Sequence, residues 1–226
     1  MKWLKLLLLT MPVLFSSCAL KPLKIGVPDE LITALRLPVK GGDITWTLDF
    51  GPFHVYNIQD RAGKILYTDF KTSYWDIHSF EFQLSDEEGE QWNCYCEYPD
   101  KGPWDPNFRC QFKDQTPPKG YWTLTDSIVI TAGDTLWIRE YYRTENNLRV
   151  RSPLLMGYLF YFENEIRGLV DISRPSQEAV WIYPYMNPHR QRVIAAAATA
   201  LIIKFRELQI DSSFENQKID TRQKGP

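Results

Sequence analysis

The 226-residue sequence has few histidines and cysteines, and its charges nearly cancel. Lysine and arginine number 26 against 28 for aspartate and glutamate, which gives a net charge of -2. Nucleic-acid binding requires a basic surface, so we expect no nucleic-acid partner. The three histidines, His54, His78 and His189, belong to no nucleophile or metal-binding motif. We therefore expect no enzymatic activity, no metal and no cofactor.

After its first 17 residues, the sequence also lacks an apolar run long enough for a membrane span. Such a helix needs about 20 apolar residues, whereas the uncharged run at 193–203 reads VIAAAATALII and has eleven. Alanine favours helix, and a helix that is apolar on every side must be surrounded by other groups. The run therefore predicts a core helix over 188–208, with Asn187 as its N-cap and Pro188 in its first turn.

The N-terminus is typical of an export signal. Lys2 and Lys5 lie in a short basic segment that precedes an apolar core at 6–15, and Ser16-Ser17-Cys18 follows. This arrangement resembles a bacterial lipobox, although Phe15 stands where leucine is usual. The resemblance implies cleavage before Cys18 and lipid attachment to it. Ordinary cleavage, with Cys18 incidental, is the alternative.

The lipobox resemblance also implies a location. Ala19, and not aspartate, follows the cysteine, which implies a lipid anchor in the outer membrane with the protein facing the periplasm of the cell envelope. We therefore expect a signal peptide at 1–17, a lipid-anchored tether at 18–43, one domain at 44–208, and a polar disordered tail at 209–226.

The segment between the tether and the helix alternates apolar and polar residues. Residues 56–59 lead to a turn at 60–63, and residues 80–84 lead to a similar turn at 86–89, at a spacing of 26. Both turns begin with aspartate and end with glycine, which suits a tight turn. Alternating runs around such turns predict a series of β-hairpins.

The hairpins and the last helix together resemble a known family. Residues 55–66, VYNIQDRAGKIL, residues 80–89 and the apolar helix are similar to the tubby-like superfamily, which includes phospholipid scramblases and LURP-one-related proteins. The resemblance implies a mainly β fold with a C-terminal helix (α+β), in which an antiparallel meander closes into a barrel around that helix. A β-sandwich with the helix packed on one face is the alternative.

The same resemblance implies lipid binding, but it does not supply a site. Glu178 is the only carboxylate in the region 173–192, where scramblases carry their calcium-binding stretch. We therefore expect no calcium site. The basic cluster with which tubby proteins bind phosphoinositides has no counterpart here, so lipid binding rests on fold analogy.

The cysteines after Cys18 predict one disulfide in an oxidising compartment. Cys94 and Cys96 lie on one face of a predicted strand, and Cys110 begins the return strand. We expect a Cys96–Cys110 bond, with Cys94–Cys110 as the alternative.

The loop between these cysteines, residues 97–108, is rich in proline and contains Tyr98, Trp104 and Phe108. Exposed aromatic residues on a constrained loop are good binding anchors. The alternative is that Trp104 covers the end of the barrel.

These observations lead to two functional hypotheses. The first is a non-catalytic envelope lipoprotein, held at the membrane by the lipid on Cys18, that binds a ligand or partner such as a lipid. The second is an assembly protein that docks on another envelope protein through the 97–108 loop.

The lipobox interpretation makes a direct prediction. Cys18→Ser should abolish incorporation of a clickable palmitate analogue and move the protein from the membrane fraction to the soluble fraction, because the acylated sulfur is gone. The control is Cys94→Ser, which should keep the label. Labelling of the Cys18→Ser variant would contradict the lipobox.

Overall fold

The computed structural model describes residues 24–41, 47–65, 76–99, 108–114, 121–125, 128–131, 134–146, 155–174 and 176–223. The described secondary structure is mainly strand, with one short 3₁₀ helix and one long C-terminal helix. The elements are η2 (Asp29–Leu31), β1 (Leu35–Pro38), β2 (Lys40–Gly41), β3 (Leu48–Phe50), β4 (Phe53–Ile65), β5 (Asp76–Ser85), β6 (Gln91–Pro99), β7 (Arg109–Asp114), β8 (Tyr121–Thr125), β9 (Ile128–Thr131), β10 (Asp134–Tyr141), β11 (Gly157–Phe162), β12 (Glu165–Asp171), β13 (Ala179–Ile182) and α2 (Pro188–Gln223).

The strands form one antiparallel sheet in which neighbours in sequence are neighbours in space from β2 to β13. β1 pairs with β13 at one edge, and β2 pairs with β3 at the other. Val39 alone separates β1 from β2, so one short passage of chain joins the two edges of the sheet. The N–H of Val39 donates to the carbonyl of Glu178 at 2.9 Å. The sheet is thus nearly closed into a barrel, which confirms the predicted fold class.

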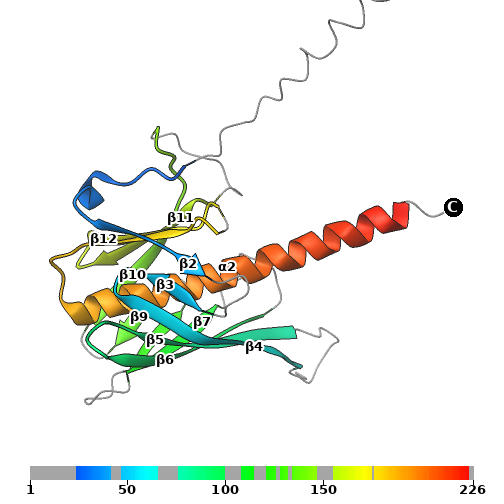
Figure 1. Ribbon diagram of the computed structural model, residues 1–226, viewed down its shortest axis with the longest axis horizontal. Helices are drawn as coiled ribbons and strands as arrows, with labels where there is room; N and C mark the ends of the chain where they lie inside the picture. Colours follow the sequence, from blue (N-terminus) through cyan, green and yellow to red (C-terminus); the bar gives the residue numbers. More distant parts are fainter. Residues whose placement is uncertain are drawn as a thin grey trace, which may run out of the picture.

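Helix α2 fills the interior of this barrel. It runs between the β11–β12 side and the β4–β6 side of the sheet, and its C-terminal part extends beyond the strands (Figure 1). Every residue from Val193 to Lys204 is buried. The large apolar side chains in this stretch each stabilise the fold by roughly 1.5–3 kcal/mol, as an upper estimate. The hydroxyl of Thr199 is satisfied within the core, since it donates to the Ala195 carbonyl at 2.8 Å.

The start of the helix follows the predicted capping pattern. Pro188 is its first residue, and the Asn187 side chain accepts a hydrogen bond from the His189 N–H at 2.8 Å. Its end differs from the prediction, because the helix continues to Gln223 and the segment 209–223 is not a disordered tail. Extending a helix that is already nucleated costs far less than starting one, so polar residues can continue the helix beyond its buried stretch.

Two other sequence-based expectations are wrong. The predicted turn at 60–63 does not form, since β4 continues to Ile65 with irregularities in its pairing to β5. The predicted tether at 18–43 contains, within its described part, the strands β1 and β2 that close the sheet. The domain therefore begins before residue 44. The predicted turn at 86–89 does form, with the Asp86 carboxylate accepting from the Glu88 N–H at 3.1 Å and Gly89 at φ 83°.

The N-terminal segment covers the outer face of one side of the sheet. Ile25 and Leu31 pack with residues of β11, β12 and β13 in a second apolar cluster outside the barrel. Ile25 also forms a bridge with Thr144. As a result, all four residues of β13 are buried, whereas β7 alternates between exposed and buried residues. The outer face of the sheet around β7 is left uncovered.

Three arginines tie the helix to the rim of the barrel. At its N-terminal end, Arg190 binds Asp134, with Nε 2.7 Å from Oδ2, and Arg192 binds Asp86. At the other end, the Nε and Nη2 of Arg206 donate to the two oxygens of the Glu178 carboxylate at 2.8 and 2.9 Å. Arg206 also donates to the Gly41 carbonyl at 3.1 Å. It therefore links the helix to β2 and to Glu178, the residue before β13 whose carbonyl also accepts from the Val39 N–H.

A test of the filled interior is Ala197→Leu. Ala197 is fully buried, and three extra carbons at that position should force strands apart and destabilise the fold by about 1–3 kcal/mol in chemical denaturation. The matched control, Glu87→Leu, adds the same side chain at an exposed turn and should change the stability little. An unchanged unfolding midpoint for Ala197→Leu would contradict close packing around α2.

The Arg206–Glu178 pair makes a second prediction. The Glu178 side chain is 1% exposed, so Arg206→Met should leave a buried carboxylate without its partner and cost about 3–5 kcal/mol. The double variant Arg206→Met/Glu178→Met should regain much of that loss. As a control, Arg167→Met removes a pair whose glutamate is 63% exposed and should cost about 1 kcal/mol or less. Equal losses in the single and double variants would refute the coupling.

Candidate functional site

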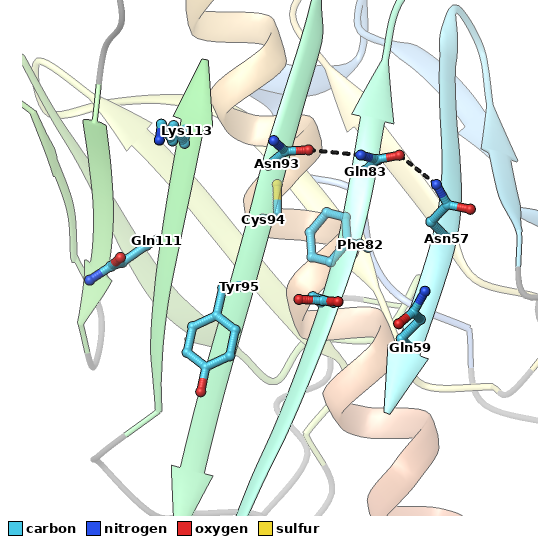
Figure 2. Close-up of a pocket in the computed structure, with 10 residues that line it drawn as sticks. Asn57, Gln59, Phe82, Gln83, Asn93, Cys94, Tyr95, Gln111 and Lys113 are labelled. Atoms are coloured by element: carbon cyan, nitrogen blue, oxygen red, sulfur yellow. Dashed lines mark hydrogen bonds between the residues drawn. The ribbon is translucent and has the colours of Figure 1, made fainter. Parts of the chain in front are cut away.

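The uncovered outer face of β4, β5, β6 and β7 carries two rows of polar side chains that cross all four strands. The register places Gln83 opposite Asn93 and Asn93 opposite Lys113, and in the next row Glu81 opposite Tyr95 and Tyr95 opposite Gln111. Both rows appear in Figure 2, with α2 behind the strands. We call this surface the amide face; its members are Asn57, Gln59, Glu81, Gln83, Asn93, Tyr95, Gln111 and Lys113.

Three side chains of the amide face form a hydrogen-bonded ladder across β4, β5 and β6. The Nδ2 of Asn57 donates to the Oε1 of Gln83 at 2.5 Å, and the Nε2 of Gln83 donates to the Oδ1 of Asn93 at 2.9 Å (Figure 2). The ladder has a direction, because each amide donates to the next. It fixes the orientation of amides on an exposed surface, where they would otherwise rotate freely.

The ladder begins at a distortion of β4. The pairing of β4 with β5 shifts between Tyr56 and Gln59, and Asn57 has a positive φ of 52°. Asparagine tolerates this left-handed conformation better than most residues. A bulge redirects the side chains of its strand, and bulges are common beside functional sites. Here Asn57, within the shift, and Gln59, at its end, both face outward.

The two rows border a hollow of about 450 Å³, within the range of roughly 300–1,000 Å³ typical of ligand sites. Phe82 and Cys94 lie between the rows, but their side chains are buried at 1% and 2% exposure. The hollow therefore reaches the main chain between the rows. Its described lining has one carboxylate, Glu81, and one ammonium group, Lys113, so its formal charge is balanced.

The predicted disulfide lies directly below this face. Cys96 and Cys110 are opposite each other on β6 and β7, and they form a bond with an S–S distance of 2.02 Å. Both are buried, so the bond fastens the two strands from the inner side. Cys94 remains a free thiol, and burial raises its pKa well above the usual value. A thiol that stays protonated is a poor nucleophile, so Cys94 is a packing residue.

The predicted binding loop is corrected in part. Tyr98 and Phe108 are only 2% and 3% exposed and belong to the core. Their rings meet edge-on, with centroids 6.2 Å apart. The ammonium of Lys204, on α2, lies 4.3 Å from the Phe108 ring centroid. The two residues thus surround a charged group of the helix and do not present anchors to a partner. Trp104 lies outside the described residues.

The three histidines occupy separate places. His54 is exposed and its Nδ1 lies 2.8 Å from an Asp49 oxygen, His78 stacks on Tyr98, and His189 contacts the Trp92 ring. Burial lowers the pKa of His189, which favours its neutral form. Within the part of the chain that the structure describes, no three histidine, cysteine, aspartate or glutamate residues converge as metal ligands.

A second hollow, of about 560 Å³, lies where the N-terminal segment meets the outer face of β10–β12. Its lining includes Pro28, Glu30, Tyr141, Arg143 and Tyr161. The segment is held there by the Gly26 N–H, which donates to the Arg143 carbonyl at 2.9 Å. A Cβ at Gly26 would lie 2.2 Å from the Thr144 oxygen, so only glycine allows this approach. The second hollow is thus formed by the same contacts that dock the segment.

Comparisons with known proteins give no family for the chain. No protein-family model, no curated protein and no solved structure matches it significantly. The tubby-like resemblance and the lipobox therefore remain predictions. Among the described residues, no helix has both the length and the hydrophobicity needed to cross a membrane.

The amide face was not predicted from the sequence, although part of its signal was present. Asparagine, glutamine and tyrosine alternate with buried residues on β5, β6 and β7. Alternation predicts which side chains face outward. It does not predict which of them are neighbours, since that depends on the register of four strands and on the bulge at Asn57.

Proposed function

We propose that this protein is a non-catalytic, membrane-anchored envelope lipoprotein that binds a ligand through the amide face. The oriented Asn57–Gln83–Asn93 ladder beside a hollow is the observation that carries the proposal. Recognition of a polar ligand requires hydrogen-bond donors and acceptors that are held in fixed positions on a concave surface.

The proposed anchor determines which way the amide face points. Lys24, whose carbonyl accepts from the Glu145 N–H at 2.9 Å, comes six residues after Cys18. Six residues of extended chain reach at most about 22 Å. A lipid on Cys18 would therefore hold the side of the domain that carries the N-terminal segment near the membrane. The strands β4–β6 lie on the opposite side of α2 (Figure 1), so the amide face would point away from the membrane.

The compartment and the absence of catalysis rest on further observations. The Cys96–Cys110 disulfide supports an oxidising environment such as the periplasm. The described lining of the hollow has one carboxylate, whereas glycoside hydrolysis uses a pair, which supports binding without catalysis. The side chains of α2 occupy the apolar interior of the barrel, which favours a polar ligand on the outside over a lipid chain within.

A photo-cross-linker placed at Gln111 of the full chain in living cells tests this proposal. The residue lines the hollow and is exposed, so irradiation should give a specific adduct. The adduct should be lost in the Asn57→Ala/Asn93→Ala variant, because the ladder no longer orients the site. The control position is Tyr185, which is 85% exposed and not in the lining. No adduct at Gln111, or the same adduct at both positions, would refute binding through the amide face.

A further inference from the structure

The amides of this face combine donors and acceptors in the way that hydroxyl-rich ligands require. An asparagine or glutamine side chain offers two N–H donors and a carbonyl with two lone pairs. The ladder uses one donor from Asn57 and one from Gln83. Asn93 accepts the last of these bonds through Oδ1, and the residue lines the hollow. A sugar hydroxyl both donates and accepts, so it can bond to either end of such a ladder.

One aromatic ring stands beside these amides. Tyr95 is 38% exposed, and its hydroxyl lies 3.5 Å from the Glu97 carboxylate, which it contacts as a donor. In the register, Tyr95 lies between Glu81 and Gln111, in the row next to the ladder. Aromatic side chains offer a large apolar surface at low cost in conformational entropy. The C–H face of a pyranose ring can lie on such a surface while its hydroxyls reach the amides.

The charge of the lining and the topology of the sheet disfavour two other ligand classes, anions and peptides. Glu81 and Lys113 are the only charged groups in the described lining, and they balance, so an anionic ligand such as a phosphate gains no net attraction. A peptide that binds by strand addition needs an unpaired sheet edge. β5 and β6 are paired on both sides, so the centre of this face presents side chains and no such edge.

We infer that the ligand of the amide face is a neutral saccharide, with one sugar ring placed against Tyr95 and its hydroxyl or amide substituents bonded to the ladder. The inference rests on the proposed function, because it assigns the chemical class of the ligand to the same surface. The volume of about 450 Å³ and the open position of the hollow suit a short stretch of a longer glycan more than an enclosed monosaccharide.

The test is calorimetric titration of the full chain, purified in detergent, with two β-1,4-linked tetrasaccharides. One consists of N-acetylglucosamine and the other of glucose, so the pair shows whether the ladder requires an acetamido group. We expect at least one of them to bind at micromolar to millimolar concentration. Tyr95→Ala and Asn93→Ala should each weaken that binding about tenfold or more. Tyr95→Phe, which keeps the ring, should retain most of it.

The matched control is Tyr185→Ala, which removes an exposed tyrosine elsewhere and should leave the Kd unchanged. The three positions changed here, Asn93, Tyr95 and Tyr185, are exposed, and equal melting temperatures would show that the four variants fold. Binding that survives both Tyr95→Ala and Asn93→Ala overturns the inference, as does no binding of either sugar at millimolar concentration. If neither sugar binds but Gln111 still gives its specific adduct in cells, the saccharide assignment fails while the proposed function stands. If neither sugar binds and Gln111 gives no specific adduct, both the saccharide assignment and the proposed function are refuted.

Discussion

The burial of α2 inside the sheet is the interaction on which the rest of this structure depends. The stretch from Val193 to Ile203 is apolar on every side and cannot lie on one face of an open sheet without leaving side chains in water. The strands therefore surround it, and inward positions such as Phe80, Phe82 and Phe160 form one continuous core with the helix. The small side chains of Ala195 to Ala198 leave room for the strands to come near. The helix is thus the centre of the core and not an addition to a finished barrel.

A sheet that surrounds a helix has to close, and closure depends on few contacts. β1 and β2 are short, and Val39 alone connects them. Arg206 contacts both the side chain of Glu178, which precedes β13, and the carbonyl of Gly41 in β2, so the helix itself joins the two sides of the closure. At the opposite end, Arg190 and Arg192 bind acids of separate hairpins. The apolar stretch supplies most of the burial, whereas the arginines at its ends fix its position along the barrel axis.

Because the interior is occupied, recognition has to use the outer surface. The N-terminal segment covers the outside of β11–β13, which leaves β4–β7 as the polar, uncovered side. On that side the inner residues Cys96 and Cys110 fasten neighbouring strands, and the outer residues Gln83 and Asn93 bond to each other. A rigid sheet below and a hydrogen-bonded ladder above together give a surface whose side chains are already in position for a ligand.

The sequence by itself determined the features that depend on local pattern. An uninterrupted apolar run predicts a surrounded helix, Asn187 and Pro188 predict its start, and strand alternation predicts that Cys94 and Cys96 share one face of their strand. Tertiary structure decided the features that depend on pairing between distant segments. Turn chemistry at Asp60 was overridden because a long β4 gains pairing with β5. The short stretch from Leu35 to Gly41, which contains Pro38, became the closing strands. The amide face belongs to this second group, since Asn57, Gln83 and Asn93 become neighbours only through the register of three strands and a bulge that no local pattern specifies.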